Sequence, residues 1–140
     1  STDISEIEKA TAKGGDWIIL IKSATNVLKG DNFVFVYPEL LQNKIIVREG
    51  EVISSEILEL KDLDYKNINV TIKNLLKQTT DNIKSRGSIV TEINTKGDFI
   101  KKIRDALKIN QNTKYRLEVL SLKESKTADP ILVELNITKM

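Results

Sequence analysis

The apolar residues of this chain occur in short, strand-length runs, and this pattern constrains the fold more than any other feature. The longest uninterrupted run, Trp17 to Ile21, ends at Lys22 and is far shorter than the ~20 residues that a membrane-spanning helix needs. Its apolar side chains fall on both alternating faces, which predicts a strand buried in the core. A second two-sided run, 33–37, is expected to form a strand that Pro38 ends, with a turn or a single helical turn over 39–43.

Six further segments have the composition of strands. The clearest alternation of apolar and polar residues lies over 67–73. Glu49-Gly50-Glu51 separates two of the segments, which predicts a hairpin because glycine adopts the positive φ of a tight turn. In another segment the apolar parity changes at Leu120, which predicts a β-bulge or burial of both faces. The six expected strands are 44–48, 52–60, 67–73, 88–94, 114–122 and 131–138.

Helical periodicity is clearest over residues 97–108, where apolar side chains recur every three or four residues. Thr95, followed three residues later by Asp98, predicts the N-terminal cap of this helix. A short N-terminal helix is expected after Asp3, ending before the two glycines at 14 and 15. Residues 74–86 fit a helix or the end of a strand followed by a loop, and the sequence leaves both open.

These elements predict an α+β fold: one β-rich domain over 1–140, with a mixed or antiparallel sheet, one main amphipathic helix at 97–108 and a short N-terminal helix. The order strand 67–73, strand 88–94, helix, strand, strand resembles the β-grasp topology of ubiquitin-like domains. That resemblance implies a hairpin feeding one helix that packs across the sheet. The chain has no terminal Gly-Gly, so the resemblance does not extend to a conjugated modifier.

The chain contains no cysteine and no histidine, which excludes several classes of site. Without cysteine there are no disulfides, zinc ribbons or thiol nucleophiles. Without histidine, the usual general base and the usual transition-metal ligand are absent. The glycines lack the spacing of a phosphate-binding loop, and no serine has the Ser-x-x-Lys spacing. We therefore expect a non-catalytic protein that holds no cofactor and no metal ion.

Carboxylates are the one plentiful acid–base group, and they concentrate between Glu49 and Asp64. Asp62-x-Asp64 begins like a calcium-binding loop, but Lys66 stands where a third oxygen ligand is required. An enzyme would need Glu56 with Glu59, or Asp62 with Asp64, to line a pocket. The alternative is a solvated hairpin face, which the low aromatic content also favours over a sugar-cleaving site.

The net charge of +2 conceals an uneven distribution. Residues 1–70 carry 8 basic and 12 acidic groups, whereas residues 71–140 carry 14 and 8. The basic excess predicts a surface for a protein partner, acidic in character, or for self-association of the chain. A nucleic-acid-binding domain using the basic helix 96–108 is the alternative. The expected partner-binding residues are Lys101, Lys102, Arg104, Lys108, Lys114 and Arg116.

The N-terminal region gives a second resemblance. Strand 17–22, then Ser23-Ala24 and Asn26, then a strand ending Val36-Tyr37 with Leu40 after it, resembles the start of the outer-membrane lipoproteins of type VI secretion systems. Pro38 departs from the polar continuation of that family. The resemblance implies a β-sandwich that docks a partner and catalyses nothing, and it makes a secretion or envelope component a further alternative. We expect a cytoplasmic protein by default, or an exported or lipid-anchored one if a signal sequence was removed before Ser1.

Overall fold

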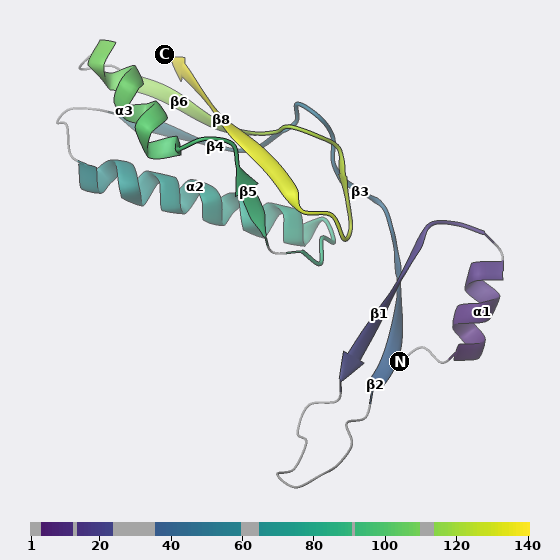
Figure 1. Ribbon diagram of the computed structural model, residues 1–140. Helices are drawn as coiled ribbons and strands as arrows, with labels where there is room; N and C mark the ends of the chain where they lie inside the picture. The colour runs from purple at the N-terminus through teal and green to yellow at the C-terminus, as the bar shows by residue number, and fades with distance from the viewer. Residues whose placement is uncertain (1–3, 13, 24–35, 60–64, 91, 110–113) are drawn as a thin grey trace, which may run out of the picture. The chain divides into compact units, whose positions relative to one another are not determined.

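The computed structural model describes residues 1–140 except 1–3, 13, 24–35, 60–64, 91 and 110–113. Its residues separate into two compact units, Ser1–Lys44 and Ile45–Met140, and each is described by itself. Helices and strands both contribute substantially, with mixed and antiparallel sheets, so the predicted α+β class is confirmed (Figure 1). The expectation of one domain over 1–140 stays a prediction.

The first unit holds a helix and a two-stranded ribbon. Helix α1 (Ile4–Ala12) confirms the predicted N-terminal helix, although its predicted cap, Asp3, lies outside the described residues. Strands β1 (Trp17–Ser23) and β2 (Val36–Gln42) pair antiparallel along their whole length. Among the described residues of this unit, the sheet is this two-stranded ribbon and not the sandwich that the lipoprotein resemblance implies.

Three expectations for this ribbon were wrong. Pro38 does not end its strand but lies within β2, opposite Ile21, and the predicted turn over 39–43 is strand as far as Gln42. Proline is tolerated there because β2 is an edge strand and needs no N–H on its outer side. The strand β1 is also not buried, since Ile21 is 62% exposed.

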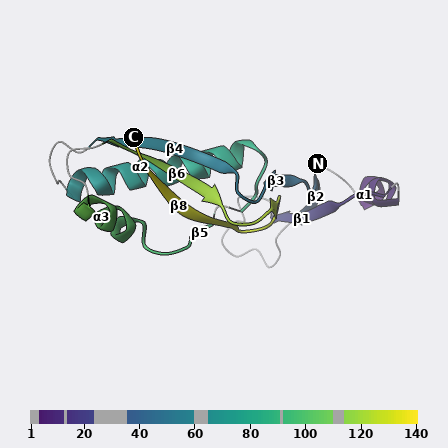
Figure 2. The same cartoon turned by 90° about the horizontal axis from the view of Figure 1, so that it is seen from above.

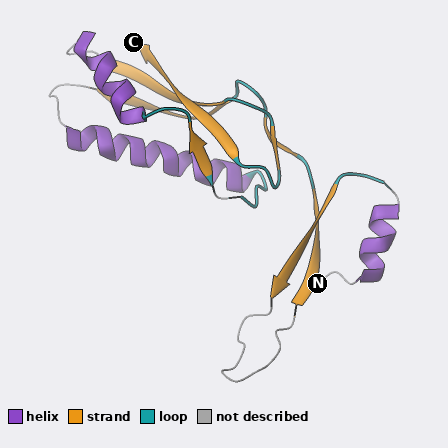
Figure 3. Cartoon of the chain, viewed as in Figure 1, coloured by secondary structure: helices purple, strands orange, loops and turns teal. Residues whose placement is uncertain are grey.

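The second unit is built on a four-stranded sheet with the order β4-β6-β8-β5. Neighbouring strands are antiparallel except β5 and β8, which run parallel. A short ribbon of β3 and β7 accompanies the sheet. The strands are β3 (Ile45–Val47), β4 (Val52–Glu59), β5 (Ile93–Thr95), β6 (Lys114–Ser121), β7 (Ser125–Lys126) and β8 (Ile131–Lys139) (Figure 3).

The predicted hairpin of 44–48 with 52–60 is wrong in its pairing, although its turn is present. The Glu51 N–H donates to the Arg48 carbonyl at 3.2 Å, and Gly50 has a φ of 78°. However, the Gly50 N–H donates to the Ser121 carbonyl, so the turn directs the chain onto β6. Strand β3 pairs with β7 instead, and the bulge expected near Leu120 lies on the partner strand β4.

The segment 67–73, predicted as a strand, is helical. It belongs to α2 (Tyr65–Ser85), which also settles residues 74–86 as helix up to Ser85. The side chains that α2 buries recur every three or four residues, as a helix requires. Val70, which the alternation placed among the buried residues, is 47% exposed. The buried positions of α2 are Ile68, Ile72, Leu75, Thr79 and Ile83.

Gly87 ends this helix. It has a φ of 101°, its N–H donates to the Lys84 carbonyl, and the Ser88 N–H donates to the Ile83 carbonyl. This pair of bonds is the Schellman arrangement, which favours glycine at the left-handed position. The strand expected over 88–94 is reduced to β5. The β-grasp resemblance implies a hairpin of 67–73 with 88–94. Because 67–73 belongs to helix α2, these two segments do not form that hairpin.

Helix α3 (Phe99–Ile109) confirms the predicted helix at 97–108, but its cap is different. The Asp98 side chain accepts hydrogen bonds from the N–H groups of Ile100 at 3.0 Å and Lys101 at 3.2 Å, so Asp98 and not Thr95 is the N-cap. At 21 residues α2 is the longer helix, so α3 is not the single main helix that was expected.

Both helices cover the same face of the sheet. The Ser54 hydroxyl of β4 contacts Thr79 of α2, and the Tyr115 hydroxyl of β6 donates to the Ala106 carbonyl of α3. The register places Ser54 opposite Val119, which has the same strand parity as Tyr115. Helix α2 runs along the length of the sheet in both views (Figures 1 and 2). Within this unit the opposite sheet face carries no described helix, and this face, called the uncovered face below, is where the candidate site lies.

Candidate functional site

The uncovered face of the sheet presents the alternate residues of β4 and β6. On β6, Tyr115, Leu117 and Val119 are buried under the helices, so Arg116 and Glu118 point the other way. Register continues this face onto β4 and β8. The cross-strand neighbours are Ile57 opposite Arg116, Ser55 opposite Glu118, Thr138 opposite Arg116 and Asn136 opposite Glu118.

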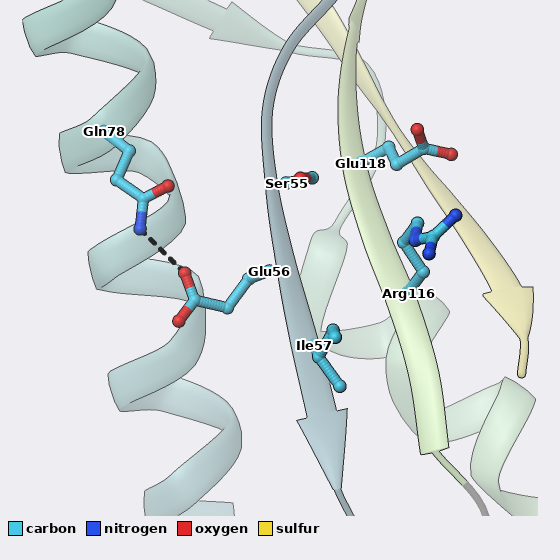
Figure 4. Close-up of a pocket in the computed structure, with 6 residues that line it drawn as sticks. All are labelled: Ser55, Glu56, Ile57, Gln78, Arg116 and Glu118. Carbon is cyan, nitrogen blue, oxygen red and sulfur yellow. Dashed lines mark hydrogen bonds between the residues drawn. The ribbon is translucent and has the colours of Figure 1, made fainter.

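A shallow, open depression of about 700 Å³ lies at the β4 edge of this face. In the close-up, Arg116 and Glu118 extend away from α2, whereas Glu56 extends toward Gln78 (Figure 4). The polar groups therefore do not converge on one point, as the groups of a catalytic pocket would. The depression is lined by Ser55, Glu56, Ile57, Gln78, Arg116 and Glu118.

Glu56 has a structural contact. Its carboxylate accepts a hydrogen bond from the Gln78 side-chain amide at 2.7 Å. One turn further along α2, the Asn82 amide donates to the Ile53 carbonyl at 2.6 Å. These two bonds fix α2 along the outer edge of β4, so the edge strand is partly covered on its helix side.

Ile57 and Arg116 are the accessible pair of the depression. Ile57 is 56% exposed, which is high for an isoleucine in a sheet. The Arg116 guanidinium has no hydrogen-bond or ion-pair partner among the residues that the structure describes. Glu118, by contrast, accepts a hydrogen bond from the Asn136 amide at 3.4 Å. An apolar side chain beside an unpaired guanidinium is an arrangement that suits contact with another molecule.

The structure divides the six predicted partner-binding residues between two places. Lys101, Lys102, Arg104 and Lys108 lie on α3, in the helix layer. Lys114 and Arg116 lie on β6, with the strand parity of the uncovered sheet face. The six therefore lie partly in the helix layer and partly on the uncovered sheet face.

Most of the α3 cations are already engaged within the chain. The Lys102 ammonium donates to the Leu135 carbonyl of β8, and the Lys108 ammonium lies 3.8 Å from the Asp105 carboxylate. Arg104 also has a partner within the chain. Lys101 has none among the described residues. On β6, neither Lys114 nor Arg116 has a side-chain partner among the described residues.

The carboxylates expected for an enzyme are not brought together. Glu56 pairs across the sheet with Leu117 and Glu59 with Lys114, and these positions have opposite parity, so the two carboxylates face opposite sides of β4. Asp62 and Asp64 lie outside the described residues. Among the described residues, no group of three or more acidic side chains is close enough to hold a metal ion.

Sequence reasoning found Arg116 but missed Ile57, Ser55, Gln78 and Glu118. The sequence did contain one indication of Ile57. Ile57 and Leu58 are adjacent in a strand, so their side chains lie on opposite faces of the sheet, and one of the two aliphatic side chains must lie on the face that the helices leave uncovered. Gln78 was out of reach, because its proximity to Glu56 depends on α2 packing beside β4.

No helix in the described part of the chain is long and apolar enough to cross a membrane. Comparison with protein-family models, with curated proteins and with solved structures gives no match.

Proposed function

We propose that the second unit is a non-catalytic protein-binding module whose contact surface is the uncovered sheet face around Ile57 and Arg116. The observation that carries this proposal is the half-exposed Ile57 beside the unpaired Arg116 guanidinium. The partner is an acidic protein segment that also presents apolar side chains. It places a carboxylate on Arg116 and an aliphatic group on Ile57.

The chemistry of the two side chains supports this partner. An arginine fork binds a carboxylate through two parallel hydrogen bonds, and its planar group loses less solvation on contact than an ammonium does. Buried arginines with neighbouring apolar anchors carry much of the energy of protein interfaces. Ile57 supplies that anchor directly across the strand pair from Arg116.

The order of charges along β6 gives the site a direction. The same face reads Lys114, Arg116 and then Glu118. Two cations followed by an anion favour a ligand whose acidic end lies over Lys114 and whose neutral or basic end lies over Glu118. Such complementarity fixes register and orientation more than it raises affinity.

The proposal is tested by nuclear magnetic resonance on the ¹⁵N-labelled full chain. Two synthetic peptides of alternating sequence serve as probes, one of glutamate and leucine and one of lysine and leucine. We expect the acidic peptide to shift the amide signals of Ile57, Lys114 and Arg116, and the basic peptide to leave them unchanged. A single-stranded oligonucleotide is the third probe, because helix 96–108 was the alternative nucleic-acid surface.

Shifts confined to α3 with the acidic peptide would overturn the choice of the sheet face. Shifts of Lys101, Arg104 and Lys108 with the oligonucleotide, weakening steeply as salt is raised, would favour the nucleic-acid alternative instead. Turnover of a substrate that depends on Glu56 would contradict the non-catalytic assignment.

A further inference from the structure

The ribbon of the first unit has an exposed apolar face, and no strand in the described part of the chain pairs with either of its edges. Register places the odd-numbered residues of β1 on one face together with the even-numbered residues of β2. Six of these eight residues are apolar, the exceptions being Ser23 and Gln42, and Ile19, Ile21 and Val36 are 51%, 62% and 63% exposed. The apolar residues of this face are Trp17, Ile19, Ile21, Val36, Pro38 and Leu40.

The two edges of the ribbon differ in their protection. On β2, Pro38 removes one backbone donor and Glu39 adds a charge, and both features discourage a further strand. On β1, the stretch from Trp17 to Ile21 contains no charge, no proline and no glycine, and its residues strongly favour strands. The unprotected edge of the ribbon is therefore β1.

A ribbon of two strands is marginal in water, and three or more strands with an apolar face are needed for independent stability. We propose that the β1 strands of two copies of this chain pair antiparallel, giving a four-stranded sheet with the order β2-β1-β1-β2. The pairing is centred on Ile19, which lies opposite Ile19 of the second copy. Trp17 then lies opposite Ile21 of the second copy, so each exposed residue of β1 gains an apolar neighbour.

Charge complementarity selects this register. With Ile19 at the centre, Lys22 of each copy lies opposite Asp16 of the other, so both ends of the pairing bring unlike charges together. Each group already has a contact in its own copy: Lys22 pairs with Glu39, and Asp16 accepts from the Asn43 amide at 3.0 Å. A register centred on Leu20 would instead place Lys22 opposite Ile18 and lose both attractions.

The size of the apolar face agrees with self-pairing at an edge rather than with face-to-face stacking. Taking on the order of 100 Å² of apolar surface for a whole aliphatic side chain, the exposed parts of the face amount to about 300 Å², at the lower end of patches that have a function. Stacking two such faces would bury about 600 Å², below the ~1,000 Å² that a specific interface needs. Edge pairing adds backbone hydrogen bonds, which do not depend on that area.

Cysteine cross-linking of the full chain tests the register, because the chain has no cysteine of its own. In an antiparallel pair centred on residue 19, Ile19→Cys places two thiols directly opposite each other, within the Cα separation that a disulfide requires. We expect mild oxidation to link Ile19→Cys into a covalent dimer. Leu20→Cys should not link, since Leu20 faces Ile18 of the second copy, and Val70→Cys on α2 is a matched control of similar exposure.

Two further measurements keep the test independent of any one variant. Sedimentation equilibrium of the unmodified chain should give twice the 15.8 kDa of one copy as concentration rises. The emission of Trp17, the single tryptophan, should shift to the red on dilution. Ile19→Lys places like charges at the centre and should weaken dimerisation at least about tenfold, equivalent to about 1.4 kcal/mol, whereas Val70→Lys should not weaken it.

Each other outcome overturns the proposal. A chain that stays monomeric at every concentration shows that β1 does not pair with a second copy. Linking of Leu20→Cys in preference to Ile19→Cys shows the other register. A dimer that Val70→Lys weakens as much as Ile19→Lys shows that the copies associate through a different surface.

Discussion

A buried pair of hydroxyl groups joins α2 to β4 and provides a quantitative test of how the second unit is packed. The Oγ atoms of Ser54 and Thr79 lie 2.6 Å apart, and both side chains are buried. The Thr79 hydroxyl donates to the Leu75 carbonyl at 2.8 Å. Since its proton is used there, Thr79 accepts from Ser54. The Ser54 hydroxyl has only a long second contact, 3.4 Å, to the Leu75 carbonyl.

Replacing one partner should cost more than replacing both. Thr79→Val keeps the volume of the side chain but leaves the Ser54 hydroxyl buried without a good acceptor, which should lower the free energy of unfolding by about 1–3 kcal/mol. Ser54→Ala should cost about 1 kcal/mol, because Thr79 keeps its bond to Leu75. In the double variant no buried hydroxyl is left without a partner, so the loss should be smaller than the sum of the two single losses by about 1 kcal/mol or more.

Urea denaturation followed by far-ultraviolet circular dichroism gives these free energies. Thr80→Val is the matched control, since Thr80 makes the same kind of bond to the Leu76 carbonyl at 3.0 Å but touches no hydroxyl of β4. It should show no coupling to Ser54→Ala. If the losses for Ser54→Ala and Thr79→Val add to within about 0.3–0.5 kcal/mol, the two residues do not interact and the packing of α2 on β4 is wrong.

Three other perturbations test separate contacts. Asp98→Ala removes the N-cap of α3 and should lower the free energy of unfolding, measured in urea, by about 1 kcal/mol. Thr95→Ala should leave the free energy of unfolding unchanged. A loss for Thr95→Ala and none for Asp98→Ala would show that Thr95 is the cap, as the sequence predicted. Arg86→Met removes a guanidinium that donates to the Glu51 carboxylate in the β3–β4 turn and to the Ile46 carbonyl of β3. Thermal unfolding should show a loss of stability of about 1 kcal/mol, a small value because the ion pair is one-third exposed to solvent. The hydrogen bond from Lys22 to Glu39 raises the pKa of Lys22. The stabilisation of the ribbon by this bond is therefore complete below the ordinary lysine pKa and is lost as pH rises through the raised pKa. Trp17 emission should report a transition at that alkaline pH which Lys22→Met abolishes, and a transition at neutral pH would contradict this cause.

The helix α3 could be predicted from the sequence, whereas α2 could not, and the reason lies in the length of the pattern. Phe99, Ile103 and Leu107 repeat at helical spacing and are all buried. In α2, a window of seven residues fits strand alternation equally well. The helical period becomes visible only when this window is extended to the buried positions Leu75, Thr79 and Ile83 further along the chain.

Strand pairing was the part of the fold that local pattern could not supply. The turn at Gly50 was predicted correctly, yet β4 pairs with β6, whose residues are about sixty positions further along the chain. The candidate site depends on that pairing, because it alone places Ile57 beside Arg116. Charge counting therefore selected Arg116 as a surface cation without indicating its neighbour, and it grouped Arg116 with α3 residues that lie in the other layer.

The most direct test of the proposed binding surface compares two charge reversals of the same chemistry. Arg116→Glu and Lys108→Glu each change the net charge by two, but the first lies on the uncovered sheet face and the second on α3 beside Asp105. Isothermal titration calorimetry would measure the affinity of each full-length variant for the glutamate–leucine peptide. We predict that Arg116→Glu weakens binding at least about tenfold and Lys108→Glu less than about twofold. Equal losses, or a larger loss for Lys108→Glu, would contradict the assignment of the sheet face as the binding surface.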